Sequence, residues 1–297
     1  MASNIHLFTT NQRRKLIRGL VFLSLIRWYN LLVVALAQYL AAYFILHHDV
    51  AWYAVVFDLR LFGVVSATGL VIAGGYIINA FYDMEKDLAN RPDEVIIGRV
   101  LTKTHAFRGY LLVNGLALLL SLALKPSLVV FNGLFAFGLW FYSHKLKKKP
   151  FLGNLAAATL TVAAFFAVCV YYRMVNQTIL VYAIFIVLIT LIREIVKDLE
   201  NMKGDLLYGY QTVPVVHGIR RTKQLLYVLI VSGILPFSLL YATKPLEGLL
   251  WYFVSCGIML AITAGWIQRA KRPADFGKVN TLLKILILTG VASIVLL

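Results

Sequence analysis

The chain contains two acidic stretches that follow long apolar runs, NAFYDMEKD (79–87) and REIVKDLENMKGD (193–205). We refer to them as the first and second acidic motifs. Nine of the thirteen Asp and Glu residues of the chain fall within 83–94 or 194–205. Because carboxylates are costly beside the hydrocarbon of a bilayer, two concentrated groups predict a functional site.

The composition is typical of an integral membrane protein. Of the 297 residues, 61% are hydrophobic and 14% are charged. A helix needs about 20 mainly apolar residues to cross a bilayer, and nine apolar runs approach this length. The sequence therefore predicts an all-α integral membrane protein, a bundle of nine transmembrane helices in one domain over 1–297. The predicted spans are 20–46, 61–81, 109–124, 127–143, 154–173, 178–196, 224–243, 248–267 and 279–297, with a tight hairpin at 125–126.

The net charge of +16 is distributed unevenly over this predicted topology. The N-terminal segment and the loops on its side carry twenty-three Lys and Arg residues, whereas the opposite loops carry four. Basic residues concentrate on the cytoplasmic side of membrane proteins, so we expect the N-terminus and both acidic motifs there. Topology then explains most of the charge, and no nucleic-acid partner is expected.

In the first acidic motif, oxygen-bearing side chains repeat at helical spacing. Asn79, Asp83 and Asp87 are four residues apart, which places them on one face of a helix that continues the second predicted span. Mg²⁺ binds oxygen ligands and takes one or two carboxylates together with substrate phosphates. This face is therefore a candidate Mg²⁺ site, while Glu85 lies off it and is expected to be solvated. A solvated helix end without a ligand is the alternative.

The second acidic motif shows a similar stripe. Its members follow the spacing i, i+4, i+7 and i+11: Glu194, Asp198, Asn201 and Asp205. Gly204 is a candidate helix end, which would remove the last position from the stripe. Arg193 and Lys197 lie beside the stripe, where they can pair with its carboxylates or with phosphate. An interfacial ladder of ion pairs without a ligand is the alternative.

Two acidic faces with basic residues beside them suit a diphosphate. Metal ions can bridge its oxygens to carboxylates, and Lys or Arg neutralises the remaining charge. The same groups stabilise the diphosphate as it leaves, when charge grows on the bridging oxygen. With an apolar bundle beneath, the pattern indicates ionisation of an allylic diphosphate and capture of the carbocation by a nucleophile. A transporter of an anion or divalent metal is the alternative from another class, but its acidic residues should lie near the bilayer midplane.

The first motif and the segment after it carry a family resemblance. Asn79-x-x-x-Asp83-x-x-x-Asp87 resembles Asn-Asp-x-x-Asp-x-x-x-Asp, the first motif of the UbiA superfamily of intramembrane prenyltransferases, with Ala80 where the family usually has a carboxylate. NRPDEVIIGRV (90–100) is similar to the family's Asn-Arg-Pro-x-Arg-Pro-Ile-x-x-Gly-Arg-Val, except that the second Arg-Pro is Glu-Val at 94–95.

Three further segments extend the resemblance over essentially the full chain. IRWYN (26–30) and YSHKLK (142–147) resemble family segments near the first span and after the fourth. The second acidic motif, together with TVPVV (212–216), closely resembles the digeranylgeranylglyceryl phosphate synthase-like branch of the family. Met202 stands where other branches have an acid, so Asp198 and Asp205 are the better-matched pair.

The resemblance implies a bundle of nine helices around a central cavity, which the acidic motifs cap on the cytoplasmic side, with Mg²⁺ as cofactor. The implied catalytic residues are Asp83, Asp87 and Asp198. The implied metal ligands are Asn79, Asp83, Asp87, Asp198, Asn201 and Asp205. Candidates for binding the diphosphate or the acceptor are Arg27, Asn30, Arg91, Lys145, Lys147, Arg193 and Lys197. Of these, Lys147 is explained equally well as one of the lysines at 147–149 that contribute to the charge asymmetry across the membrane.

The implied activity is Mg²⁺-dependent prenyl transfer within the membrane. In this branch the donor is a polyprenyl diphosphate, geranylgeranyl diphosphate above all, and the lipophilic acceptor is a prenylglyceryl phosphate of ether-lipid synthesis. The departures at Ala80 and at 94–95 leave prenylation of an aromatic or quinone precursor open. A CDP-alcohol phosphatidyltransferase is disfavoured, because neither acidic motif has the Asp-Gly and Ala-Arg pattern of that family.

Overall fold

The computed structural model describes residues 19–46, 50–90, 95–243 and 247–296. Within these ranges the long elements are all helices, so the all-α prediction is confirmed. The helices are α2 (Trp28–Leu40), α3 (Trp52–Val56), α4 (Leu59–Asn90), α5 (Lys103–Leu124), α6 (Pro126–His144), α7 (Leu152–Tyr172), α8 (Gln177–Leu207), α9 (Val213–Ser232), α10 (Ile234–Thr243), α11 (Glu247–Arg269) and α12 (Pro273–Ala292). A π-helical segment, Ala41–Leu46, extends α2, and 3₁₀ turns lie at Leu146–Lys148 and Ser293–Leu296.

Eight helical stretches in the described ranges are long and apolar enough to cross a bilayer, and the chain is an integral membrane protein. They correspond to the first six predicted spans and the last two. The seventh, 224–243, is divided between α9 and α10, which meet at Gly233, and neither helix reaches the length and hydropathy of a span by itself. The count of nine spans therefore stays a prediction.

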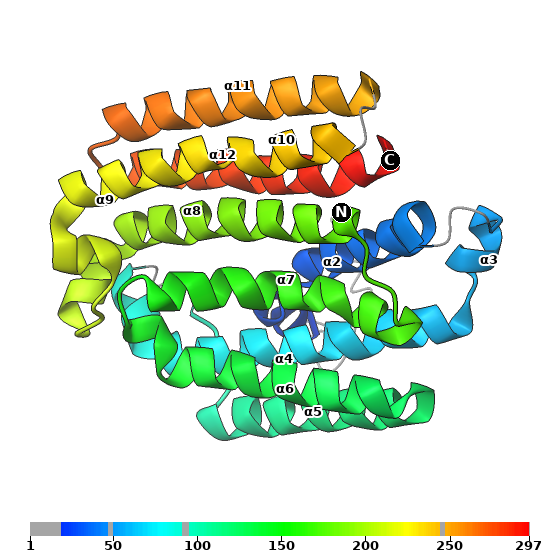
Figure 1. Cartoon of the computed structure of the whole chain (residues 1–297). Coiled ribbons are helices and arrows are strands. Elements are labelled where there is room, and N and C mark those ends of the chain that lie inside the picture. The colour runs from blue at the N-terminus through cyan, green and yellow to red at the C-terminus, as the bar shows by residue number, and fades with distance from the viewer. Residues whose placement is uncertain (1–18, 47–49, 91–94, 244–246, 297) are drawn as a thin grey trace, which may run out of the picture.

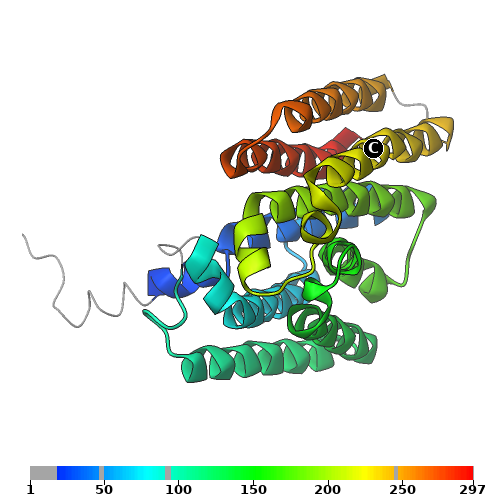
Figure 2. The same cartoon turned by 90° about the vertical axis from the view of Figure 1, so that its left-hand side faces the viewer.

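α8 is the central helix of the bundle. In its most apolar stretch 72% of the residues are buried, the largest share among the eight candidate spans. It packs against α7, α9 and α12, and also against α4. Figure 1 and Figure 2 both show α11 and α12 on one side of α8 and α5 on the opposite side of the molecule. The second acidic motif is thus carried by the most enclosed helix.

The first predicted span, 20–46, is not one continuous α-helix. Residues 19–25 are helical, a turn follows at 26–27, and Arg27 has a left-handed φ of 50° before α2 begins. A left-handed residue other than glycine costs free energy and interrupts the helical hydrogen bonds. The run is apolar except for a few polar residues, Arg27 among them, and hydropathy alone did not predict a break at that residue.

α4 and α8 are longer than the spans predicted for them, because each continues through its acidic motif. They have 32 and 31 residues, well beyond the length of about 20 that crosses a bilayer. The expectation that Gly204 ends the second motif's helix was wrong. The backbone N–H of Tyr208 still donates to the carbonyl oxygen of Gly204, and α8 ends at Leu207. Asp205 therefore keeps its helical register.

The turn between α5 and α6 lies where the sequence predicted it. α5 ends at Leu124 and α6 begins at Pro126, whose fixed φ suits the first helical position. α5 starts earlier than predicted, at Lys103, because the side chain of Thr102 accepts a hydrogen bond from the backbone N–H of His105.

Candidate active site

The two acidic motifs lie at the same end of the bundle. They occupy the last turns of α4 and α8, toward the left-hand side of Figure 1. Two connections meet over this end, the α6–α7 loop (145–151) and the α8–α9 loop (208–212). Their backbones are joined where the N–H of Gln211 donates to the carbonyl oxygen of Lys148 at 3.0 Å.

The first acidic motif forms the predicted face. Asn79 Nδ2 donates to Asp83 Oδ2 at 3.0 Å, as expected for side chains one helical turn apart. Asp83 is only 4% exposed, and Lys147 forms an ion pair with the same carboxylate oxygen. Lys147 Nζ also donates to Asn79 Oδ1 at 2.8 Å. Asp87, one turn further on, is half-buried, and Glu85 is exposed as predicted.

A close backbone contact holds Lys147 at this position. The 3₁₀ turn that contains it lies against the start of α7, where Gly153 is buried. A Cβ atom at Gly153 would lie 2.8 Å from the carbonyl oxygen of Leu146 and 3.2 Å from the Cα of Lys147, so only glycine permits the approach. Lys145, predicted for the same role, stays exposed at the surface.

A second ion pair joins the two motifs directly. Lys86, on the first motif, reaches Asp205, on the second, with 2.6 Å between Nζ and Oδ1. Asp205 is 0% exposed and Lys86 is 8% exposed. The other carboxylate oxygen of Asp205 accepts a hydrogen bond from Thr212 Oγ1 at 3.2 Å. Both oxygens of Asp205 are therefore engaged by other side chains of this chain.

Tyr210, in the α8–α9 loop, sits between these groups. Its ring centroid is 4.5 Å from Lys86 Nζ and 5.2 Å from Lys148 Nζ, within the range of cation–π attraction. Its hydroxyl donates to Asp83 Oδ1 at 3.4 Å. Burial, together with the negative charges of Asp83 and Asp205, raises the pKa of Tyr210 well above its usual value. The hydroxyl therefore remains a donor at any physiological pH.

In the second acidic motif the carboxylates have different partners. Asp198 accepts a hydrogen bond from Asn154 Nδ2 on α7 at 2.6 Å. Glu194 pairs with its helix neighbours, with 2.9 Å to Arg193 Nη1 and 3.2 Å to Lys197 Nζ, which is one of the two pairings that the sequence left open for these basic residues.

Asn201 turns its amide back onto its own helix. Its Nδ2 donates to the carbonyl oxygen of Lys197 at 2.9 Å, and the residue is half-buried. Glu200 points to the other side of α8, where its Oε2 accepts a hydrogen bond from Asn280 Nδ2 on α12 at 3.1 Å. Carboxylates two positions apart on α8 thus contact two different helices.

The remaining predicted residues lie at the edge of this cluster. The guanidinium of Arg27 lies 5.4 Å from the ring centroid of Tyr76, and Asn30 Nδ2 donates to the Tyr76 hydroxyl at 2.9 Å. Tyr76 is three residues before Asn79 on α4, so these contacts join α2 to α4 one turn from the first motif. Arg91 lies outside the described residues.

Four residues in the cluster were not among the predicted site residues: Lys86, Asn154, Tyr210 and Thr212. For Lys86 a signal existed, because it lies seven residues from Asn79 and three from Asp83 and so shares their side of the helix. The other three meet the motifs only through the packing of separate helices and loops. Helical spacing contains no information about such contacts.

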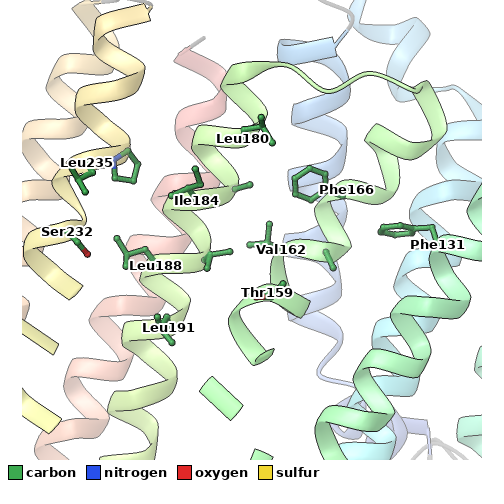
Figure 3. A pocket seen from close by; sticks show the side chains of 14 residues that line it. Phe131, Thr159, Val162, Phe166, Leu180, Ile184, Leu188, Leu191, Ser232 and Leu235 are labelled. Atoms are coloured by element: carbon green, nitrogen blue, oxygen red, sulfur yellow. The ribbon is translucent and has the colours of Figure 1, made fainter. Parts of the chain in front are cut away.

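An apolar pocket extends away from the acidic motifs along α8. Its volume is about 690 Å³, and Figure 3 shows its α8 side chains between those of α7 and α10. Leu180, Ile184 and Leu191 line it and lie on one stripe of α8. The same stripe continues through Glu194 to Asp198, seven residues beyond Leu191. The pocket therefore ends about 10 Å along the helix from Asp198.

The oxygen atoms of this end suit a hard cation. In the described part of the chain, no group of three His, Cys, Asp or Glu side chains is close enough to hold a metal ion by itself. Mg²⁺ does not require such a cage, since it usually takes one or two carboxylates and completes its shell with water and substrate phosphate. The carboxylates of Asp83, Asp87 and Asp198 fit that mode of binding.

Comparison with known proteins identifies the class. The family model "UbiA prenyltransferase family" matches residues 35–288, and the chain belongs to this family. Among its relatives is the digeranylgeranylglyceryl phosphate synthase of Saccharolobus solfataricus (strain P2), with 32% identity over 93% of this chain and 95% of that protein. The protein of the same name from Thermococcus sibiricus is 30% identical, over 93% of this chain and 96% of the relative.

Solved structures show the same fold. A structure of digeranylgeranylglyceryl phosphate synthase superimposes with a TM-score of 0.71 at 24% identity, covering 93% of this chain and 96% of that one. A UbiA homologue from Archaeoglobus fulgidus, bound to DMAPP and Mg²⁺, gives a TM-score of 0.67 at 15% identity, covering 91% and 99%.

Proposed function

We propose that the chain catalyses Mg²⁺-dependent transfer of a prenyl group, geranylgeranyl by preference, from its allylic diphosphate to a prenylglyceryl phosphate. One observation carries the proposal: two acidic motifs meet at one end of an apolar bundle, with a loop lysine, Lys147, paired to Asp83. Membership in a prenyltransferase family supports the reaction class. The names of the two archaeal relatives support the glyceryl phosphate acceptor.

The reaction places its largest demand on the leaving group. The bond between C1 of the prenyl group and the bridging oxygen breaks, and the diphosphate leaves with the electron pair. The acceptor hydroxyl oxygen forms the new bond to C1 and releases its proton. Because negative charge grows on the diphosphate during bond breaking, cations held around it lower the barrier. Bound Mg²⁺ would supply much of that charge.

The chain's own residues then have distinct roles. Asp83, Asp87 and Asp198 would hold the metal, with the side-chain oxygens of Asn79 and Asn201 beside them. Lys147, together with Arg193 and Lys197, would contact the diphosphate. Lys147 is paired with Asp83, whose charge a metal ion could neutralise instead. Arg193 and Lys197 can keep Glu194 and still offer further N–H groups to the diphosphate. Arg27 and Asn30 lie one turn from the first motif and would bind the phosphate of the acceptor or the diphosphate.

The apolar pocket along α8 would give room to the hydrocarbon chain. Leu180 and Ile184 in its lining are exposed, so the pocket opens toward the surroundings of the bundle. Its volume of about 690 Å³ lies within the range of about 300–1,000 Å³ typical of ligand pockets. Its position on the same stripe of α8 as Asp198 supports a donor whose diphosphate lies at the acidic motifs and whose prenyl chain extends along the helix.

The topology belongs to the same proposal. We propose nine transmembrane spans in a single domain over 1–297, with α9 and α10 together forming the seventh. The N-terminus and the active-site loops would face the cytoplasm, because the basic residues concentrate at that side of the predicted topology.

One assay tests the function. Purified protein in lipid nanodiscs is incubated with labelled geranylgeranyl diphosphate, with and without Mg²⁺, and with either a geranylgeranylglyceryl phosphate or an aromatic quinone precursor. We expect Mg²⁺-dependent release of diphosphate and a labelled product from the glyceryl phosphate. Product from the aromatic precursor alone would overturn the acceptor. Uptake of anion or metal into vesicles without any turnover would overturn the enzyme in favour of a transporter.

A further inference from the structure

Asp205 differs from the other carboxylates of the two motifs in how completely it is enclosed. It is 0% exposed, and its two oxygens contact the ammonium of Lys86 and the hydroxyl of Thr212. The backbone of the same residue is also engaged, since its carbonyl oxygen accepts from the N–H of Tyr210 at 2.9 Å. Asp83 also has both oxygens contacted, by Asn79 and Lys147 on one and by Tyr210 on the other, but it is 4% exposed and its cation comes from a loop. Asp205 differs in being fully buried opposite a cation that a helix carries, and this leaves no solvent-open side for an ion with its waters and substrate oxygens.

The cation that pairs with Asp205 is enclosed as well. Lys86 is 8% exposed, it belongs to the helical part of the first motif, and the ring of Tyr210 covers its ammonium at 4.5 Å. The pair between Lys147 and Asp83 is different in two respects. Lys147 belongs to a loop, and one helical turn from Asp83 lies a second carboxylate, Asp87, which is only half-buried. The two ammonium groups are similarly enclosed, so the contrast lies in the segment that carries them: we expect Lys147, on the α6–α7 connection, to turn toward a diphosphate, and Lys86, on α4, to stay with Asp205.

We propose that Lys86 takes the place of a metal ion opposite Asp205. Their ion pair permanently joins the two acidic motifs, and Asp205 is a positioning residue rather than the metal ligand that its motif suggests. Metal binding then depends on Asp83, Asp87 and Asp198. The inference rests on the proposed function for the identity of the metal, but it concerns contacts within this chain.

The proposal predicts a gain of metal binding, which a purely structural role would not produce. The probe is Mn²⁺, added to the full-length protein in detergent without substrate. Isothermal titration calorimetry measures its affinity, and thermal unfolding measures how far it raises the thermal midpoint. Lys86→Met removes the cation opposite Asp205, so we expect Mn²⁺ to bind about tenfold more tightly and to raise the thermal midpoint more than in the parent. The double variant Lys86→Met/Asp205→Asn should lose this gain.

Two further variants complete the test. Lys203→Met removes an exposed lysine two residues from Asp205, and Mn²⁺ affinity should change less than about threefold, because water and salt screen an exposed charge. Asp205→Asn alone should keep the parent's Mn²⁺ affinity within about threefold, whereas Asp83→Asn should weaken it at least about tenfold.

Two outcomes would overturn the proposal. Either Lys86→Met binds Mn²⁺ no more tightly than the parent, or Asp205→Asn loses as much affinity as Asp83→Asn. If Lys86→Met does not fold, the comparison of Asp205→Asn with Asp83→Asn decides alone. A parent protein that binds Mn²⁺ in this pattern but transfers no prenyl group would refute the proposed function and leave the ion-pair assignment standing.

Discussion

The two acidic motifs look alike in sequence, but the structure holds them in different ways. In the first motif Asp83 depends on a partner from a loop, Lys147, whose position rests on a glycine contact at the start of α7. In the second motif the carboxylates have partners that are carried by helices. Glu194 pairs with its own helix neighbours, and Asp198 accepts from Asn154 on α7.

This difference suggests a division of labour. A loop can adjust when a diphosphate arrives and leaves, whereas contacts between packed helices keep carboxylates in place throughout a reaction cycle. The first motif would therefore respond to the substrate, and the second would provide the fixed frame. Substitutions in the two motifs should differ in which kinetic parameter they change.

The largest effect is expected from Asp83→Asn, which keeps the shape of the side chain and removes its charge. Asp83 contacts both Lys147 and Tyr210, so the substitution disturbs metal binding and the loop lysine together. We expect kcat/KM for prenyl transfer to fall about 10³-fold. The thermal midpoint should stay within about 5 °C, because Lys147 keeps its bond to Asn79.

Glu85→Gln is the matched control for that substitution. It removes a carboxylate from the same turn of α4, but Glu85 is exposed and lies off the active face. Activity should stay within about twofold of the parent. Equal losses for the two variants would show that the total negative charge of α4 matters rather than the face.

The helical stripes could be predicted from sequence because they depend only on the spacing of residues along one helix. Asn79 and Asp83 do share a face, and α8 carries its acidic motif in helical register through Asp205. The side of the membrane and the number of spans were also derived from spacing and charge, and these two stay predictions.

Contacts between elements could not be derived in the same way. The approach of Asn154 to Asp198 depends on how α7 packs against α8, and the position of Tyr210 depends on a loop between two helices. Lys147 shows the same limit, since the run of lysines at 147–149 is explained by the charge asymmetry across the membrane as well as by an active site. Only its burial against Asp83 separates it from the exposed Lys145.

A smaller effect is expected from Lys147→Met. The ammonium is proposed to contact the diphosphate, so its removal should raise KM for the donor and lower kcat, with kcat/KM falling about 10²-fold. Lys145→Met, two residues earlier on the same loop, should change kcat/KM less than about twofold, because Lys145 is exposed. Steady-state kinetics over a range of donor concentrations measures both. Similar losses in the two variants would assign the effect to the net charge of the loop.

The smallest effect, and the sharpest test of the fixed frame, is expected from Asn154→Ala. Asn154 touches no proposed substrate group; it orients Asp198 through one hydrogen bond of 2.6 Å. Outer partners of metal ligands typically contribute about tenfold or more in metal affinity, so the Mg²⁺ concentration for half-maximal activity should rise about tenfold. At saturating Mg²⁺, kcat should recover to within about threefold of the parent.

Asn280→Ala separates this orienting role from simple stability. Asn280, on α12, donates to Glu200, which is on α8 like Asp198. Each of the two variants therefore removes one amide–carboxylate hydrogen bond to α8. Each should cost about 1–3 kcal/mol in the free energy of unfolding. Only Asn154→Ala should change the Mg²⁺ requirement, because only Asp198 lies on the stripe that faces the pocket and the first motif. If Asn280→Ala shifts the Mg²⁺ requirement equally, α8 responds as a rigid unit, and the assignment of Asp198 as the second motif's metal ligand loses its support.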